Sequence, residues 1–358
     1  MKGDSPINTI RILSKTLQPV IKTKTNWKNL SPHLKTTPNL APALNAIHLF
    51  KKNNLIKELV DTKAPKFLKG GLTPSGKSFG ARITILPSKH LLDKAFSLFA
   101  DDLTIHDETS NTHWDVIFKN PTGKYSYLYT LEKKKKAKKK KFSAVDDFDK
   151  NLSKINRAVN KKIKESPDKT ALATRTLLDT KMRVGNEVYY KAHGHKGLTT
   201  LKKGDIRIED ARVTFSFISK DGVPQTITAK FSQEYISNLQ KILNKSKKSD
   251  FIFTNDSKKP LKDRDFSKAF KEYCGEEFYP HIVRSHYATK KAEAFLKKHK
   301  KSKKASKSEI DKLFTHIAEK LGHKKYSKGE KKWKTDYGAT IHYYIRPDFV
   351  EKILKLRN

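Results

Sequence analysis

Two basic side chains between Leu177 and Gln225 are placed by their local sequence where they could meet an anion. Arg183 follows an apolar helical stripe and precedes Gly185-Asn186, a pair typical of a helix end because both residues tolerate the left-handed conformation. Lys220 follows an alternating strand pattern and precedes Asp221-Gly222, which favours a type I′ hairpin turn. An arginine offers paired N–H donors to an anion, and a lysine at a hairpin tip can reach outward. The stretch therefore predicts two cations held at the edges of regular elements.

The charge balance points to a polyanionic partner. The chain has 77 Lys and Arg against 37 Asp and Glu, a formal charge of +40, which far exceeds what solubility requires. Nucleic acid is the first candidate for that partner. A lysine-biased composition with solvated basic faces is the alternative, and the run Lys133–Lys141 could equally contact RNA or acidic lipid.

Length and cysteine content limit the remaining classes. At 358 residues, 36% of them hydrophobic, the chain can form two domains with cores of their own. The single cysteine, Cys274, excludes an intramolecular disulfide, and the lack of Cys/His clusters at zinc-ligand spacing predicts no metal site. No stretch approaches about 18 apolar residues and the N-terminus lacks an apolar signal core, so we expect no membrane span and no secretion. The single cysteine is consistent with a reducing compartment.

Residues 1–66 are predicted to be an N-terminal appendage whose role the sequence does not indicate. Prolines such as Pro19 and Pro42 interrupt its short apolar runs. Helical spacing of apolar residues predicts one helix over Ala43–Leu59.

The segment Gly71–Ser78 matches the phosphate-loop pattern G-x-x-x-x-G-K-[ST]. A working phosphate loop follows a buried strand and opens a helix whose N-terminal amides bind the phosphates. Here Ala64-Pro65-Lys66 precedes the motif and the strand-like Ala81–Leu86 follows it. We therefore expect no bound nucleotide.

Residues 67–132 are predicted to form a small β-rich domain. Within it, His113–Leu131 alternates as two strands joined by a turn over Asn120–Gly123, with aromatic residues between lysines. The aromatic residues are Trp114, Phe118, Tyr125, Tyr127 and Tyr129. Such interleaving suits a sheet that faces a duplex and makes Lys119, Lys124 and Tyr127 candidate DNA contacts, although aromatics at alternate positions more often form a core.

Residues 133–143 are predicted to be a basic linker, because the run Lys133–Lys141 cannot pack and its like charges favour an extended chain. It could contact phosphates or serve as a solvated tether. From residue 144 to 358 a mainly helical domain is predicted. Its first helix shows apolar residues at helical spacing: Val145, Phe148, Leu152, Ile155, Val159 and Ile163.

Three further candidate residues lie in this helical domain. Tyr279–Thr289 begins a helix that tolerates Pro280 in its first turn and places Arg284 near its start. A capping box at Ser308 and Asp311 starts a later helix, which Gly322 ends directly before His323. The third is one of the adjacent tyrosines Tyr343 and Tyr344. Taken singly, such an arginine is usually a surface residue and such a histidine usually caps a helix.

Taken as a set, these motifs resemble the poxvirus-like type IB DNA topoisomerases, whose catalytic fold is shared with the tyrosine recombinases. Three motifs carry the resemblance in the first half: Arg-Val-Gly-Asn-Glu (183–187), Gly-Leu-Thr-Thr-Leu (197–201) and Phe-Ile-Ser-Lys-Asp-Gly (217–222). Three follow later: His-x-x-Arg (281–284), Leu-Gly-His (321–323) and Tyr-Ile-Arg-Pro (344–347). The resemblance covers about residues 66–358.

The resemblance implies an α+β architecture, with a small β-rich DNA-clamp domain and a mainly helical catalytic domain that contains a short antiparallel hairpin sheet. It implies that Tyr344 attacks a DNA phosphodiester to give a 3′-phosphotyrosine, that Lys220 is the general acid, and that Arg183, Arg284 and His323 stabilise the transition state. It implies catalysis without metal, cofactor or ATP by a monomer on double-stranded DNA. Lys196, in the basic loop, joins the candidate DNA contacts.

One departure from the family pattern is the longer gap between His323 and Tyr344, which contains Lys331, Trp333 and Tyr337. This insert keeps open whether Tyr343 or Tyr344 is the nucleophile.

Two alternatives to the topoisomerase hypothesis stay open. A tyrosine recombinase would carry the same catalytic residues, but a helical domain is expected in place of the hairpin at His113–Leu131. A non-catalytic basic protein that binds DNA or RNA would keep the charge and make the order of the residues a coincidence. A cytoplasmic, nucleoid-associated location is expected, or a host cell if the source is viral.

Overall fold

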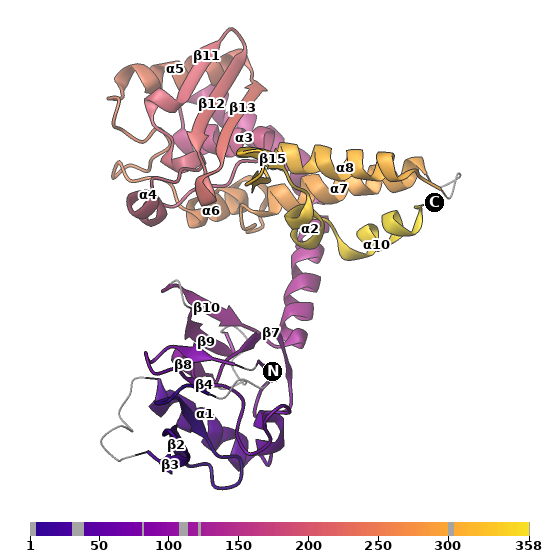
Figure 1. Cartoon of the computed structure of the whole chain (residues 1–358). Helices are drawn as coiled ribbons and strands as arrows, with labels where there is room; N and C mark the ends of the chain where they lie inside the picture. Colours follow the sequence, from indigo (N-terminus) through magenta and orange to yellow (C-terminus); the bar gives the residue numbers. More distant parts are fainter. Residues whose placement is uncertain are drawn as a thin grey trace. The chain divides into compact units, whose positions relative to one another are not determined.

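The computed structural model divides into two compact units, residues 1–139 and residues 140–358 (Figure 1). It describes residues 5–30, 39–80, 82–106, 114–120, 123–299 and 304–357. Both units combine helices with small antiparallel sheets, which confirms the predicted α+β class. Within the described ranges no helix is long and apolar enough to cross a membrane.

The first unit contains a five-stranded antiparallel sheet in the order β3-β2-β1-β4-β5. Its strands are β1 (Ile10–Ile12), β2 (Pro19–Lys22), β3 (Trp27–Asn29), β4 (Gly71–Leu72) and β5 (Ser78–Phe79). Ile10 of β1 pairs with Leu72 of β4. Residues 1–66 are therefore not a separate appendage, because their strands complete a sheet and a core with residues that follow.

Helix α1 (Leu40–Lys52) packs Leu40, Ala43 and Phe50 into this core. Its early proline, Pro42, lies in the first turn, where no intrahelical N–H partner is lost. The predicted helix over Ala43–Leu59 is too long, because Asn54 adopts a left-handed φ of 57° and ends it. A separate 3₁₀ turn, η2 (Ile56–Leu59), follows.

The phosphate-loop sequence folds as a hairpin. Gly71 pairs with Phe79 and Leu72 with Ser78, so the motif joins β4 to β5 and opens no helix. A Cβ on Gly71 would lie 2.4 Å from the Ile10 carbonyl oxygen, so this glycine permits strand pairing. The motif therefore lacks the helix N-terminus that a phosphate loop needs.

A second sheet has the order β10-β9-β8, from β8 (Asp101–Ile105), β9 (Val116–Lys119) and β10 (Tyr125–Leu128). A hairpin of β6 (Ile83–Ile85) and β7 (Leu91–Phe96) lies in the same unit. The β9–β10 pair confirms the predicted strands, while His113, Pro121 and Thr122 lie outside the described residues.

The two faces of β9–β10 differ. Val116 and Leu128 are buried in the core, whereas Tyr125 and Tyr127 are 49% and 46% exposed. Tyr125 pairs with Lys119, so the outward face combines aromatic and basic side chains. The hypothesis that these aromatic residues form a core therefore holds for only one face of the β9–β10 pair.

Helix α2 (Leu131–Glu165) spans the predicted linker. Lysine and alanine are good helix formers, and the first turn is fixed by ion pairs from Lys133 to Asp115 (2.6 Å) and from Lys134 to Asp93 (2.8 Å). The apolar stripe from Val145 to Ile163 is buried as predicted, except for Leu152, which is half-buried. Residues 133–143 are therefore helical, and the prediction of an extended linker is wrong.

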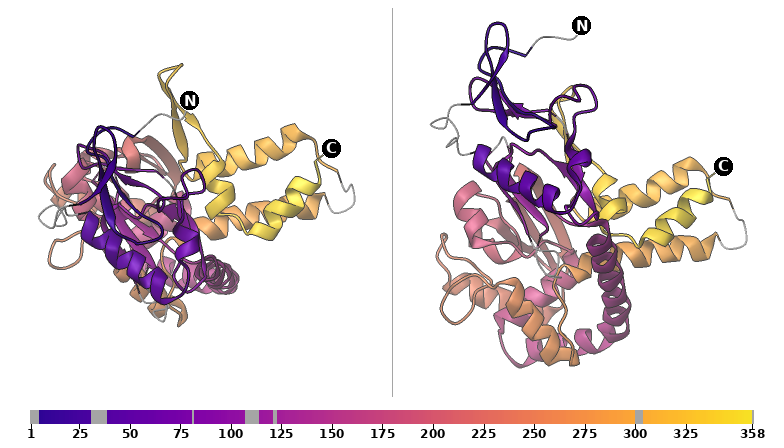
Figure 2. Two further views of the ribbon diagram at one scale, coloured as in Figure 1. Left: turned by 60° about the horizontal axis from the view of Figure 1, so that its bottom comes forward. Right: turned by 90° about the horizontal axis from the view of Figure 1, so that it is seen from below.

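The second unit is mainly helical, with a three-stranded sheet in the order β11-β12-β13 and a separate hairpin, β14–β15. Its helices after α2 are α3 (Lys169–Thr180), α4 (Glu187–His193), α5 (Gln233–Lys245), α6 (Asp263–Cys274), α7 (Ile282–Lys298), α8 (Lys307–Lys320), α9 (Gly338–Tyr343) and α10 (Pro347–Lys355). Its strands are β11 (Ile206–Glu209), β12 (Arg212–Ile218), β13 (Pro224–Lys230), β14 (Lys324–Ser327) and β15 (Lys332–Thr335). Figure 2 shows α7, α8 and α10 side by side.

The start of α8 differs by two residues from the prediction. Ser306 is the N-cap and forms the capping box with Glu309, so the predicted box at Ser308 and Asp311 is wrong. Asp311 instead accepts a hydrogen bond from the Tyr337 hydroxyl at 3.0 Å. The helix ends at the predicted place, because Gly322 has a φ of 66°.

The helical state of the lysine run can be tested with a proline. We expect Ala137→Pro to cost about 3 kcal/mol of helix stability and to speed trypsin cleavage between residues 133 and 141. Ala137→Gly, the control, should cost about 1 kcal/mol and change cleavage less. Equal cleavage rates in all three proteins would show that the run is an extended tether.

Candidate active site

Arg284 is the most enclosed of the candidate residues, at 2% exposure. It lies in the first turn of α7, and its Nη1 donates to the carbonyl oxygen of Lys181, at the end of α3. Its Nη2 donates to the carbonyl oxygen of Leu321 (2.8 Å), at the end of α8, and to Nε2 of His323 (3.0 Å). One guanidinium thus joins two helix ends, and its buried Nε finds no acceptor among the described residues.

His323 follows the α8 end with a defined protonation pattern. Its Nδ1 lies 2.7 Å from the Thr340 hydroxyl oxygen. Because an arginine can only donate, Nε2 must accept from Arg284 and Nδ1 must carry the hydrogen. Burial, then the charges of Arg284 and Arg183, lower the pKa of His323 to about 3. The imidazole is therefore neutral near pH 7.

Gly322, just before His323, must be a glycine. Its positive φ disfavours other residues, and a Cβ there would lie 2.6 Å from the side-chain oxygen of Gln225. Gln225 in turn donates from Nε2 to the Gly322 carbonyl oxygen at 2.8 Å. This contact fixes the start of β13 against the histidine.

Tyr344, rather than Tyr343, points into the cluster. Tyr344 is 6% exposed and Tyr343 is 64% exposed. The Tyr344 ring lies 4.8 Å from that of His323, and the guanidinium carbon of Arg284 lies 5.1 Å from its centroid. The charges of Arg284 and Arg183 both act on its hydroxyl.

The arginines change the acidity of this tyrosine. Burial raises the pKa of Tyr344, while the charges and hydrogen bonds of Arg284 and Arg183 lower it. The lowering prevails, so the pKa lies below the ordinary value for tyrosine. The phenol therefore loses its proton more readily than an ordinary tyrosine does.

Arg183 is held by two chain segments in close contact. The amide of Leu198 donates to the Arg183 carbonyl oxygen at 2.9 Å, and the amide of Thr199 donates to that of Val184 at 2.7 Å. A Cβ on Gly197 would lie 2.6 Å from Cα of Gly185, so only glycine at 197 permits this approach. The Arg-Val-Gly-Asn-Glu and Gly-Leu-Thr-Thr-Leu motifs therefore form one unit.

Lys220 lies at the tip between β12 and β13, as predicted, and is exposed. Asp221 and Gly222 adopt φ values of 65° and 77°, the left-handed geometry expected from the Asp-Gly pair. The charge of Lys220 contributes to the lowered pKa of His281, which places the lysine in the neighbourhood of the cluster.

Two residues of the cluster were not assigned a role from the sequence. The ring of His281 lies 5.1 Å from that of Tyr344, and burial, then the charges of Arg284, Lys141, Arg183 and Lys220, lower its pKa to about 3. His281 stands in the His-x-x-Arg motif, which could have suggested it.

Lys141 is the second residue of the cluster that was not assigned a role from the sequence. Its Nζ donates to the Tyr343 carbonyl oxygen and lies 5.4 Å from the centroid of the Tyr344 ring. No sequence pattern indicated this role, because the last lysine of a run looks the same as the others.

The candidate DNA contacts are spread over both units. Lys196 lines a cavity of about 20 Å³ together with Arg183 and Arg284, and its Nζ bonds both carboxylate oxygens of Asp205 at 2.7 Å. Lys119 and Tyr127 lie on the outward face of β9–β10, and Lys124 is exposed just before β10.

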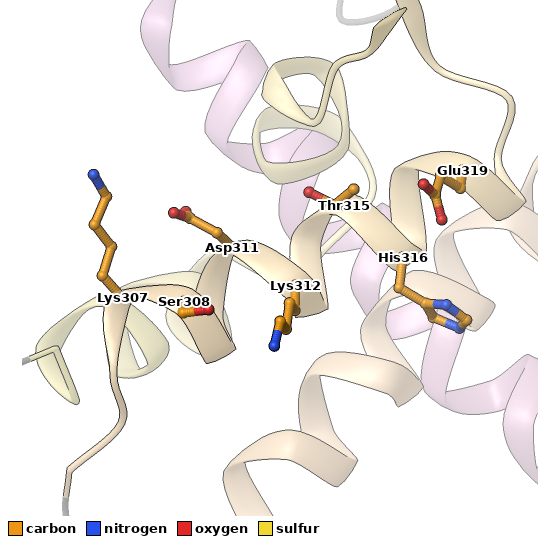
Figure 3. A pocket seen from close by; sticks show the side chains of 7 residues that line it. All are labelled: Lys307, Ser308, Asp311, Lys312, Thr315, His316 and Glu319. Atoms are coloured by element: carbon orange, nitrogen blue, oxygen red, sulfur yellow. The ribbon is translucent and has the colours of Figure 1, made fainter.

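An open depression along α8 does not bring its polar groups together. Figure 3 shows that its lining side chains project in different directions from one helix: Lys307, Ser308, Asp311, Lys312, Thr315, His316 and Glu319. In the described part of the chain, no three His, Cys, Asp or Glu side chains are grouped so as to hold a metal ion. The convergent group is the one around Tyr344.

Comparison with known proteins identifies the family to which most of the second unit belongs. Residues 130–344 match the family of the eukaryotic DNA topoisomerase I catalytic core, which is more than half of the 358 residues. The chain belongs to this topoisomerase family. The match ends at Tyr344 and includes the other four predicted catalytic residues, and it confirms the resemblance seen in the motifs.

A viral topoisomerase is also similar. The chain is 29% identical over 166 residues to DNA topoisomerase 1B of Acanthamoeba polyphaga mimivirus, a match that covers 44% of the chain and 49% of the relative. The chain thus spans about half the length of this topoisomerase.

Among solved structures, complexes of the XerH site-specific recombinase with difH substrate are similar over 49% of the chain. The pre-cleavage complex is 19% identical over 46% of its own chain, and the post-cleavage complex with palindromic difH is 18% identical over 44%. Both have a TM-score of 0.33, and a likeness at this level does not define the fold.

The close approach behind Arg183 can be tested. Gly197→Ala should lower the free energy of unfolding by about 1–3 kcal/mol and displace Arg183, because the new Cβ would lie 2.8 Å from the Arg183 carbonyl oxygen. Gly204→Ala is the control, since a Cβ there meets nothing within 4 Å. Thermal denaturation measures the difference, and equal midpoints for the two variants would contradict the packing argument.

Proposed function

We propose that this chain is a type IB DNA topoisomerase that cleaves one strand of a duplex through Tyr344, lets the duplex swivel and reseals it. The observation that carries the proposal is the burial of Tyr344 against the Arg284 guanidinium and the His323 ring, where the charge of Arg183 also acts on it. Family membership supports the same reaction.

The proposed chemistry explains why two arginines are needed. Attack on a phosphodiester passes through a pentacoordinate state with added charge on the non-bridging oxygens. Arg183 and Arg284 can give paired N–H donors to those oxygens, and the unpartnered Nε of Arg284 is one such donor. Loss of one preorganised donor typically costs on the order of 10²–10³ in rate.

His323 has a proposed role that depends on the bound phosphate. In the DNA-free chain its Nε2 accepts from Arg284, so it donates to a phosphate oxygen only after it gains a proton there. The negative charge of a bound phosphate raises the pKa of a neighbouring imidazole and favours that proton.

Lys220 is the proposed general acid. The 5′-oxygen that leaves needs a proton, and Lys220 lies at an exposed hairpin tip near the cluster. The 3′-phosphotyrosine keeps the free energy of the broken bond, so religation requires no ATP. Duplex DNA is the proposed partner, with Lys196 near the scissile phosphate and Lys119, Lys124 and Tyr127 on the outward sheet of the first unit.

Relaxation of a supercoiled plasmid tests the proposal. Purified protein should relax a plasmid of arbitrary sequence in the presence of EDTA and without ATP. A recombinase would act only on DNA that carries its site, and a non-catalytic binder would leave the supercoils intact.

The choice of nucleophile gives a specific prediction. Tyr344→Phe should abolish relaxation and the covalent complex but leave DNA binding nearly unchanged, because only the hydroxyl is lost. Tyr343→Phe should retain both, since Tyr343 is exposed. Covalent DNA trapped by Tyr344→Phe and lost in Tyr343→Phe would show that the neighbour is the nucleophile.

The proposed role of Lys220 as general acid gives a second specific prediction. Lys220→Ala should slow cleavage by about 10²–10⁴-fold on ordinary DNA. On DNA with a 5′-phosphorothiolate at the cleavage site the loss should be much smaller, because a thiolate leaves without a proton. Equal slowing of both substrates would remove Lys220 from this role.

A further inference from the structure

The β14–β15 hairpin carries a large positive charge that packing within the protein does not explain. Residues 324–335 contain six lysines and one glutamate, a net charge of 6 − 1 = +5. None of these residues is buried, and the hairpin projects beyond the helices in the left view of Figure 2.

Most of this charge is not neutralised within the chain. Glu330 pairs with Lys332 at 2.9 Å and with Lys334. Lys325, Lys328 and Lys331 have no acidic partner among the residues that the structure describes. Three lysines on one short hairpin therefore remain available to an external anion.

An aromatic pair accompanies the lysines. Tyr326 and Trp333 are cross-strand partners with ring centroids 5.4 Å apart in an edge-to-face arrangement. Tyr326 is 45% exposed, so part of the aromatic pair remains open to a partner. Lys325 and Lys334 pair on the opposite face of the hairpin. Aromatic rings can pack on sugars while lysines of the same element contact phosphates.

The hairpin is anchored to the active site at both ends. Strand β14 begins directly after His323, and the Asp336 amide that follows β15 donates to the His323 carbonyl oxygen at 3.0 Å. Lys324, on the same face as Tyr326, donates to the Pro224 carbonyl oxygen at 2.9 Å, near the tip that carries Lys220. The aromatic face thus begins beside the proposed general acid.

We propose that the β14–β15 hairpin is a DNA-binding arm that holds the duplex backbone beside the cleaved phosphate. This inference rests on the proposed function for the position of the duplex. The lysines act as point charges on phosphates and read no bases, so the contact is independent of sequence. An acidic membrane or an RNA would be a different partner, and the test includes both.

A salt titration with matched variants tests the arm. The triple variant K325Q/K328Q/K331Q leaves the Glu330 pairs intact, and K241Q/K245Q/K248Q removes the same charge from exposed positions in and after α5. Both are made in the Tyr344→Phe protein, so that covalent capture does not distort the equilibrium. Binding to a short duplex is measured against salt concentration.

The slope of log K against log[salt] is about −0.9 per phosphate neutralised. The hairpin variant should flatten it by about 2–3, and the α5 variant should leave it nearly unchanged. Equal slopes for the hairpin variant and its parent, or an equal change in both variants, would overturn the proposal. So would an unchanged duplex slope with lost binding to phosphatidylserine vesicles or to single-stranded RNA.

Fluorescence gives an independent measurement. The chain has three tryptophans, so W27F/W114F leaves Trp333 as the only one. Saturating duplex should quench or shift its emission, and K325Q/K328Q/K331Q in that background should need more DNA for the same change. Emission that stays constant at saturation would rule out contact between duplex and the aromatic face.

The arm and the proposed function fail in different ways. With the Tyr344 hydroxyl present, the hairpin variant should still relax plasmid, but at a lower salt optimum than the parent. If the parent does not relax DNA, the proposed reaction is wrong, while the titration still decides whether the hairpin binds duplex.

Discussion

The buried guanidinium of Arg284 is the interaction on which the site depends. It donates to the carbonyl oxygens at the ends of α3 and α8, groups that have no partner within their own helices. The same side chain orients His323 and lies against Tyr344. A lysine could not replace it, because a single ammonium lacks the planar set of donors that spans these positions.

The cluster is electrostatically unbalanced without an anion. The charges of Arg183, Arg284, Lys141 and Lys220 all act on His281, and both histidines remain neutral in consequence of burial and this field. Such repulsion costs stability, which the charge of a bound phosphate would offset. The depressed pKa of Tyr344 follows from the same field, so nucleophile activation and anion binding have one cause.

Close backbone contacts position these charges. Gly185 against Gly197 holds Arg183, and Gly322 against Gln225 connects His323 to the strand that follows Lys220. Tyr344 is held by Thr289, whose hydroxyl donates to its carbonyl oxygen at 3.3 Å, and by the contact of Lys141 with Tyr343. Residues as far apart in sequence as Lys141 and Tyr344 are thus brought together, in part by loops whose close approach only glycine permits.

The sequence alone determined the properties that local chemistry encodes: the net charge, the turn after Lys220, the end of α8 at Gly322 and the family motifs. The helix before Arg183 ends earlier than Gly185-Asn186 indicated, because Lys181 adopts the left-handed conformation and Asn186 instead caps the start of α4. Tertiary structure decided the rest. Only packing buries Tyr344 and exposes Tyr343, because adjacent residues on a short helix end have similar local preferences. Helix α2 includes the lysine run because Asp93 of β7 and Asp115, just before β9, neutralise its first turn. Strand β1 joins β4 across a separation that no local pattern reports. These outcomes depend on long-range contacts, which residue periodicity cannot encode.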